Sequence, residues 1–148
     1  MKKQPSNSKN QDSTENSLSM HYQALPVYYD LDNMPPEVLT DKISRQYIYG
    51  GQSMLVKWTF KKGAIVPWHH HVNEQITWIT KGSVKVLSQG KEFIVKAGGV
   101  LVIPPNVPHQ FEVLEDTINI DIFAPMRQDW YENTAIYLPE DNTKNKEN

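Results

Sequence analysis

The sequence contains no cysteine. This absence excludes disulfide bonds, thiolate metal sites and a cysteine nucleophile, and it agrees with a reducing compartment. Long hydrophobic runs are also missing. No apolar run follows Lys2 and Lys3 as a secretory signal would require, and no segment reaches the about 20 apolar residues that cross a bilayer. We therefore expect a cytoplasmic protein that has no membrane partner.

Clustered charge of one sign is absent as well. The 148 residues carry a formal net charge of −2, and the lysines are scattered. Binding to phosphate needs clustered basic side chains, so we expect no nucleic-acid partner. The length and the 39% hydrophobic content suit one globular domain with a proper core.

The two ends of the chain are rich in Ser, Asn, Gln, Lys and acidic residues. Such segments bury too little apolar surface to offset their ordering entropy, so residues 1–20 and 139–148 are predicted to be disordered tails. The folded domain is predicted to span residues 21–138.

Within that domain the hydrophobic pattern has a period of two, which indicates β-strands. Seven short runs show it, separated by turn-forming clusters such as "TKG", "SQGK" and "PPNVP". These runs are "SMLVKWTF", "EQITWIT", "SVKVLS", "EFIVKA", "VLVIP", "HQFEVL" and "TINIDIFA". The pattern predicts an antiparallel sandwich or small barrel. Only residues 34–43 offer a short helix, with prolines in its first turn.

The stretch "PWHHHVNEQITWITKG" contains three consecutive histidines followed by an acid and an amide. Side chains two apart share a face of an extended strand. If the tripeptide opens a strand, His69, His71 and Gln75 lie on one side, and His70 and Glu74 on the other. His109 follows "IPPNVP" at the start of another predicted strand and is the third imidazole candidate.

Neutral imidazole is the commonest metal ligand in proteins, and facing imidazoles are costly to bury without a metal or a partner. The pattern therefore favours a metal site over the alternative, a solvent-exposed histidine-rich loop. His70 is interpreted as a surface residue or as a residue that supports the ligands, and His21 stays unassigned.

Two spacings resemble the motifs of the cupin superfamily. The pattern G-x5-H-x-H-x3-Q-x6-G is met by Gly63, His69, His71, Gln75 and Gly82, where cupins usually have Glu at the Gln75 position. The pattern G-x5-P-x-G-x2-H-x3-N is matched by Gly98, Pro104 and His109, but Asn106 and Val113 depart from it. The resemblance implies an all-β antiparallel jelly-roll barrel that holds one divalent metal through His69, His71, Gln75 and His109.

The neutral Gln75 leaves the full charge of such a metal uncompensated. One extra unit of charge at 4 Å is worth up to about 4 kcal/mol at an effective dielectric of 20, so the site should favour an anionic ligand. Nitrogen and oxygen donors leave Mn, Fe, Co, Ni, Cu and Zn as candidates. A triad of two histidines and a carboxylate would require Glu74 to turn inward.

The final predicted strand has two different faces. Ile118, Ile120 and Ile122 form a wholly aliphatic face, as expected of a side that packs against another layer, and Asn119, Asp121 and Phe123 form the other face. From the pattern alone, Asp121 could face solvent on an edge strand, and Arg127 could be an ordinary surface arginine.

The segment "DIFAPMRQDW" resembles the ending of a subset of small bacterial cupins, including those that act on unsaturated uronates in pectin and alginate degradation. That resemblance implies that Asp121, Phe123 and Arg127 work beside the metal. A guanidinium can bind a carboxylate bidentately, and a carboxyl group can move a proton.

The leading hypothesis is thus a non-redox isomerase or lyase that acts on a small carboxylated or enolic substrate. The alternatives are a metal-dependent dioxygenase and a non-catalytic small-molecule binding module. The resemblance also implies a homodimer, and residues 22–29 are a candidate pairing segment.

Overall fold

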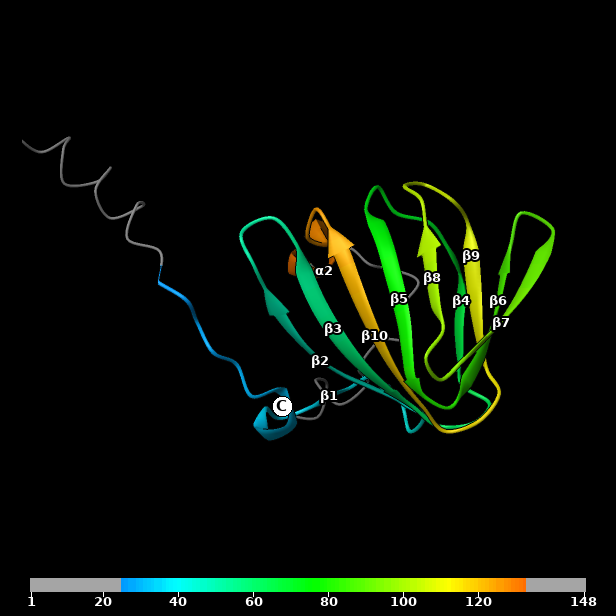
Figure 1. The fold of residues 1–148 in the computed structure, drawn as a ribbon, viewed down its shortest axis with the longest axis horizontal. Helices are drawn as coiled ribbons and strands as arrows, with labels where there is room; N and C mark the ends of the chain where they lie inside the picture. The colour runs from blue at the N-terminus through cyan, green and yellow to red at the C-terminus, as the bar shows by residue number, and fades with distance from the viewer. Residues whose placement is uncertain (1–24, 133–148) are drawn as a thin grey trace, which may run out of the picture.

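The computed structural model describes residues 25–132, which form two antiparallel β-sheets (Figure 1). The six-stranded sheet has the order β1-β2-β3-β10-β5-β8, and the four-stranded sheet has the order β4-β9-β6-β7. The strands are β1 (Glu37–Val38), β2 (Ile43–Tyr49), β3 (Met54–Phe60), β4 (Ile65–His69), β5 (Glu74–Lys81), β6 (Ser83–Ser88), β7 (Lys91–Lys96), β8 (Val100–Ile103), β9 (His109–Val113) and β10 (Thr117–Ala124). The predicted all-β jelly-roll architecture is confirmed.

The core lies between the two sheets. Met54, Val56, Trp58 and Phe60 alternate along β3 and are buried, as the period-two pattern predicts. The four-stranded sheet supplies the opposing apolar layer, which consists of Val66, Val84, Val86, Val95, Phe111 and Val113. Burial of these alternating side chains fixes the register of each strand, because a one-residue slip would turn them outward.

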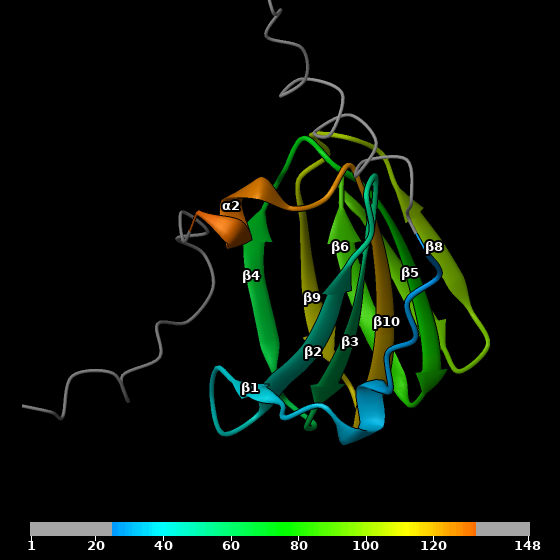
Figure 2. The ribbon, with the colours of Figure 1, turned by 90° about the vertical axis from the view of Figure 1, so that its left-hand side faces the viewer.

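Helical structure is limited to two short segments, a 3₁₀ turn (η1, Leu31–Asn33) and one α-helical turn (α2, Gln128–Tyr131). Trp130 of α2 makes edge-to-face contacts with Tyr47, Trp58 and Phe123, which anchor the helix on the inner side of β2, β3 and β10. Figures 1 and 2 show α2 at the same end of the molecule as the loop between β4 and β5. Neither helical segment of the described chain is long and apolar enough to span a membrane.

Several expectations for single elements are wrong. Residues 34–43 form no helix but contain β1. Strands β2 and β4 are additional to the seven runs that the hydrophobic pattern indicated. The histidine tripeptide does not open a strand, because His69 ends β4 and a loop follows. The isoleucines of β10 are half-buried or exposed, whereas Asn119, Asp121 and Phe123 are buried in the interior.

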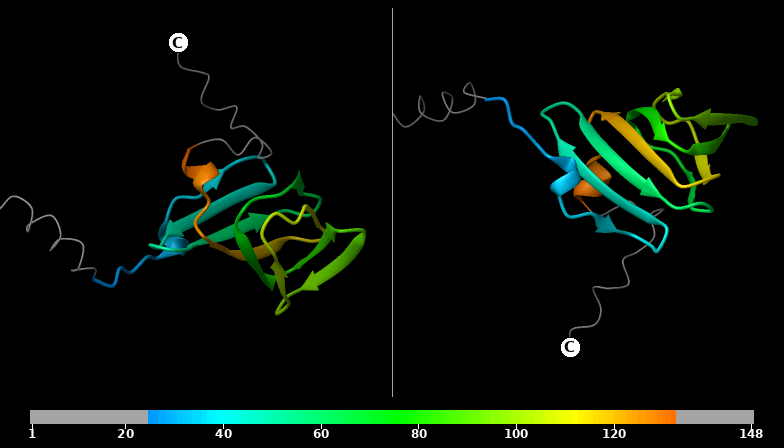
Figure 3. Two further views of the ribbon diagram at one scale, coloured as in Figure 1. Left: turned by 90° about the horizontal axis from the view of Figure 1, so that it is seen from above. Right: turned by 60° about the horizontal axis from the view of Figure 1, so that its bottom comes forward.

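The predicted terminal tails, residues 1–20 and 139–148, lie outside the described residues. The same holds for His21 and for residues 22–24 of the candidate pairing segment. Its remaining residues, 25–29, adopt no regular secondary structure and lead away from the barrel (Figure 3). Their apolar side chains, Leu25, Val27, Tyr28 and Tyr29, are exposed.

Candidate metal centre

Three imidazoles meet between the sheets. His69 ends β4 and lies directly opposite His109, the first residue of the neighbouring β9. His71 comes from the loop that connects β4 to β5. One ring nitrogen of each histidine lies within 4.8 Å of the corresponding atoms of the other two. The structure thus brings together the three histidines that the sequence selects.

Backbone carbonyls fix the tautomer of each ring. Nδ1 of His69 lies 2.7 Å from the Pro67 carbonyl oxygen, Nδ1 of His71 lies 3.0 Å from that of Asn73, and Nδ1 of His109 lies 2.8 Å from that of Val107. A carbonyl oxygen only accepts, so every Nδ1 carries the proton. Each neutral ring therefore has its lone pair on Nε2.

The three rings resist protonation. Burial, together with the neighbouring His109, lowers the pKa of His69 to about 3. Burial and the nearby Arg127 guanidinium lower the pKa of His71 to about 4. Burial also lowers the pKa of His109. At neutral pH the cluster is therefore a set of uncharged donors, which is the state that binds metal ions.

Gln75 is the fourth candidate ligand and begins a chain of polar contacts. Its Oε1 lies 3.1 Å from Nε2 of His71. Its Nε2 donates to Oγ1 of Thr77 over 2.9 Å, and the Thr77 hydroxyl donates to Asp121 over 2.7 Å. This chain sets the orientation of the amide, so an amide oxygen and an imidazole lone pair face each other.

Two features of this arrangement fit a cation. Facing lone pairs on Gln75 and His71 repel unless a positive charge lies close to both. His109 Nε2 is buried and has no hydrogen-bond partner among the described residues, although buried polar atoms are almost always paired. Nitrogen and neutral oxygen donors suit a borderline transition metal. His69, His71, His109 and Gln75 could therefore hold one divalent ion.

Asp121 is the buried carboxyl group of the site. It accepts hydrogen bonds from the Trp58 indole (2.9 Å), the Thr77 hydroxyl (2.7 Å) and the Asn119 amide (2.8 Å). Burial raises its pKa, and these hydrogen bonds oppose the shift without cancelling it. A raised pKa makes the protonated form of a carboxyl group easier to reach, which suits a group that must both gain and lose a proton.

Arg127 brings a positive charge to the same interior. Its Nε and Nη2 donate to the two carboxylate oxygens of Asp129 over 2.8 and 2.6 Å. Its guanidinium carbon lies 5.0 Å from the ring centroid of Phe123 and 5.0 Å from that of Trp130. Burial alone would raise the pKa of Asp129, but the Arg127 cation more than reverses this, and the pKa is lowered.

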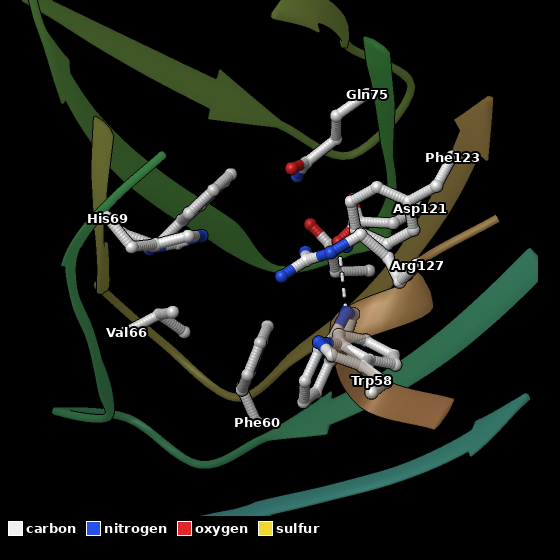
Figure 4. Close-up of a pocket in the computed structure, with 11 residues that line it drawn as sticks. Trp58, Phe60, Val66, His69, Gln75, Asp121, Phe123 and Arg127 are labelled. Atoms are coloured by element: carbon white, nitrogen blue, oxygen red, sulfur yellow. Dashed lines mark hydrogen bonds between the residues drawn. The ribbon is translucent and has the colours of Figure 1, made fainter. Parts of the chain in front are cut away.

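A small cavity connects the two parts of the site. It has about 20 Å³ of free volume, and a single water molecule needs about 10–15 Å³. Figure 4 shows His69 on one side of the cavity and Gln75, Asp121 and Arg127 on the other. A wider groove of about 490 Å³ lies at the same end, lined partly by His70, His71, Asn73 and Asp129.

The other histidine and the glutamate of this segment point away from the imidazole cluster. His70 and Glu74 are both exposed, so no described contact draws Glu74 toward the imidazoles. Phe123, in contrast, is buried with its ring 5.4 Å from that of His71.

Sequence reasoning missed four residues that support this site: Trp58, Thr77, Asn119 and Asp129. Thr77 and Asn119 could have been found, because each stands two positions from a candidate residue and therefore shares its face. Trp58 resembles an ordinary core residue of β3. Asp129 lies within the segment "DIFAPMRQDW", but the sequence analysis assigned it no role.

Comparisons with known proteins agree with this geometry. Residues 56–123 match the cupin domain family. The chain is 35% identical over 106 residues to the pectin degradation protein KdgF of Dickeya dadantii (strain 3937), which covers 70% of this chain and 96% of that protein.

Solved structures give the same picture. KdgF from Halomonas sp. superimposes with a TM-score of 0.66 at 26% identity, covering 70% of this chain and 99% of the other. An RmlC-like cupin from Shewanella frigidimarina gives a TM-score of 0.66 at 27% identity, covering 72% and 96% of the two chains. The chain therefore belongs to the cupin family and is similar to KdgF.

Proposed function

We propose that this protein is a metal-dependent cupin enzyme that converts an unsaturated uronate, or a closely related carboxylated enol, without a change of redox state. The observation that carries the proposal is the chain of polar contacts from His71 through Gln75 and Thr77 to Asp121, in which the links from Gln75 onward are hydrogen bonds. It joins a cluster of neutral metal donors to a buried carboxyl group with a raised pKa. The similarity to a pectin degradation protein supports the choice of substrate class.

Arg127 supplies the carboxylate-binding group in this proposal. Its guanidinium is held inside the site by Asp129 and by the rings of Phe123 and Trp130. In such a low-dielectric setting a cation attracts an anionic substrate more strongly than it would in water. The small cavity has room for about one water molecule, so we place the sugar acid in the groove beside His70 and Asn73, with its reacting end directed toward the cavity.

Asp121 moves the proton. Conversion of an enol to a ketone requires that one proton leave the hydroxyl oxygen and that one proton reach the carbon of the double bond. A carboxyl group that is readily protonated can deliver the second proton and then accept the first, which restores its initial state. When bound, the metal supplies Lewis-acid polarisation of the substrate oxygen. Trp58, Thr77 and Asn119 keep the carboxyl group oriented throughout.

No described carboxylate completes a triad with the histidines, since Glu74 is exposed on the outside of β5. The dioxygenase hypothesis that relied on Glu74 therefore receives no support from its position.

The test follows the ultraviolet absorbance of a 4,5-unsaturated uronate in the presence of the purified, metal-supplemented protein. We expect the signal to decay, and we expect Asp121→Asn to slow the decay at least about 100-fold, the low end of what a general acid-base group contributes. Asp41→Asn, which changes an exposed aspartate, is the matched control. Binding of the uronate without turnover by the wild-type protein would replace the enzyme proposal with a binding module.

A further inference from the structure

One atom of the Asn119 amide is bonded and the other is not. Asn119 lies on β10 two residues before Asp121 and is 1% exposed. Its Nδ2 donates to Oδ1 of Asp121 over 2.8 Å. Its Oδ1 is buried and has no hydrogen-bond partner among the described residues. Because buried polar atoms are almost always paired, this oxygen is an acceptor in need of a donor.

The neighbouring carboxylate fixes which way the amide faces. Turning the amide over would bring its oxygen against Oδ1 of Asp121, and two acceptors repel each other. The pairing of β10 with β5 also shifts in register between Ile118 and Asn119, and a bulge of this kind commonly re-aims a side chain beside a functional site. The orientation of the unpaired oxygen is therefore set by the fold.

The cavity beside Asn119 is the place where a donor can reach this oxygen. Two other buried side-chain atoms of the described chain lack a partner, Arg45 Nη1 and His109 Nε2, but of the three residues only Asn119 lines the cavity. The walls include Phe60 and Val66 (Figure 4), whose side chains offer no hydrogen bond. The free volume of about 20 Å³ suits one water molecule or one hydroxyl group.

We propose that Asn119 determines the specificity of the site for a substrate hydroxyl group, which enters the cavity and donates a hydrogen bond to Oδ1. The inference rests on the proposed function and assigns one further contact to the same sugar acid. Support of Asp121 alone would not require this oxygen, because a donor-only side chain such as the Trp58 indole bonds the carboxyl group without adding an acceptor. Since Nδ2 and Oδ1 belong to one amide, the hydroxyl group lies close to the carbon that Asp121 protonates.

The strength of the selection comes from leaving the buried acceptor unpaired. A site that hydrogen-bonds a hydroxyl group rejects an analogue without it, in the best cases by about 10⁴–10⁵-fold. A deoxy analogue would leave room for a water molecule, which could replace the missing donor. Fluorine is the sharper probe, because it fills the place of the hydroxyl group and donates no hydrogen bond.

The experiment measures kcat/KM of the full-length, metal-supplemented protein for a 4,5-unsaturated uronate and for analogues in which one hydroxyl group at a time is replaced by fluorine. The readout is the ratio of the parent value to the analogue value. For one analogue we expect this ratio to be at least about 10-fold larger in the wild type than in Asn119→Leu. Both values should fall in Asn119→Leu, because Asp121 loses a donor, but only the loss of Oδ1 changes the ratio.

Thr77→Val is the matched control. It also removes a hydrogen bond to Oδ1 of Asp121 and leaves the Asn119 amide in place. It should slow the parent and the analogue by the same factor and keep the wild-type ratio, which also cancels the intrinsic effect of fluorine on the reaction. The same ratio in Asn119→Leu as in the wild type, or an equal loss of the ratio in both variants, overturns the proposal.

A crystal structure of the wild-type protein with a saturated uronate needs neither turnover nor a variant, so it also decides the matter if Asn119→Leu does not fold. We expect a hydroxyl oxygen of the uronate within about 3.0 Å of Asn119 Oδ1, where the free protein should hold one water molecule. A bound uronate that leaves Oδ1 unpaired or paired only with water overturns this inference even if the protein turns the unsaturated uronate over. The hydroxyl contact without turnover overturns the proposed enzyme and supports the inference, and a protein that binds no uronate overturns both.

Discussion

Gln75 gives the site a neutral amide where most cupin sequences have a carboxylate. Because Gln75 contacts His71 on one side and Thr77 on the other, it affects both the metal donors and Asp121. Replacing it by glutamate would change one atom type and one charge, with little change in volume. This position therefore offers the most direct test of why an amide is present.

For Gln75→Glu we expect tighter metal binding and weaker binding of the anionic substrate. The added negative charge stabilises a divalent cation, but it repels a carboxylate, and one charge at about 4 Å is worth up to about 4 kcal/mol. A rise in KM of at least about 10-fold corresponds to a third of that value. Substrate kinetics and competition with a chelator measure the two effects. An unchanged KM would show that the substrate does not experience the charge at this position.

The lowered histidine pKa values predict the pH dependence of the metal-free protein. A histidine with a folded-state pKa below the unfolded value of about 6.5 stabilises the folded state above that pH and loses this contribution as the pH falls. For His69 and His71 the loss spans pH 6.5 down to about 3 and about 4, respectively. We expect each of these two rings to lower the free energy of unfolding by on the order of 3 kcal/mol between pH 7 and pH 4.

Urea unfolding across this pH range measures the effect. His71→Gln should flatten the profile, whereas His70→Gln changes an exposed neighbour and should leave its slope as in the wild type. A wild-type stability that does not change with pH in this window would contradict the buried, neutral state of the cluster.

At the scale of single elements, the turn between β5 and β6 shows how close packing constrains the motif glycines. Gly82 has a φ of +84°, and a Cβ atom there would lie 2.4 Å from the Asp116 carbonyl oxygen. Gly98 has a similar φ of +87°, but a Cβ atom would meet nothing within 4 Å. The two positions therefore share the conformational requirement and differ only in the close contact.

Alanine at each position separates the two effects. Gly98→Ala should lower the free energy of unfolding by about 1–2 kcal/mol, which is the penalty for a left-handed conformation of a residue with a side chain. Gly82→Ala should cost at least about 1 kcal/mol more, because the backbone of β10 must move away to relieve overpacking. Denaturant unfolding gives both values, and equal costs would show that the turn relaxes freely.

The α2 segment holds the cationic side of the site. Asp129 bonds two donors of Arg127, so we expect Asp129→Asn to leave the guanidinium less well oriented and to raise KM several-fold, with a smaller effect on kcat. Asp41→Asn, which changes an exposed aspartate outside the groove, serves as the control. A lowered KM would indicate instead that Asp129 competes with the substrate for Arg127.

Element by element, the sequence pattern predicted the alternating strands well. It also predicted the inward direction of His71 and Gln75, although these residues do not lie on one regular strand with His69. The pattern failed where contacts between distant elements determine the local structure. β4 is short and lacks alternation, and α2 depends on Trp130 packing against three strands. The two faces of β10 were distinguished correctly. The alternation alone left the environment of Asp121 open, and the resemblance placed Asp121 and Phe123 inside the barrel, where both are buried.

For the whole molecule, the candidate metal centre spans both sheets. His69 and His109 belong to the four-stranded sheet, and Gln75 belongs to the six-stranded sheet. An ion bound by all of them would link the two layers and would bind only the folded chain, which stabilises it by mass action.

We therefore expect a chelator to lower the unfolding temperature of the metal-loaded protein. At a metal concentration 100 times the dissociation constant, the difference in stability is about 2.7 kcal/mol. Differential scanning calorimetry with and without chelator measures it, and His109→Gln should abolish most of the difference. A wild-type unfolding temperature that is the same in both conditions, despite bound metal, would show that the ion binds outside the histidine cluster.

The register of β10 also limits how the gene for this protein can change. The strand presents Asp121 and Phe123 to the interior and isoleucines to the outside, so one inserted or deleted residue within it would exchange the two sets. The isoleucines would then fill the cavity, and the acid would enter the apolar outer face. Insertions and deletions should therefore be tolerated in the turns at either end of residues 117–124 and be selected against within the strand itself.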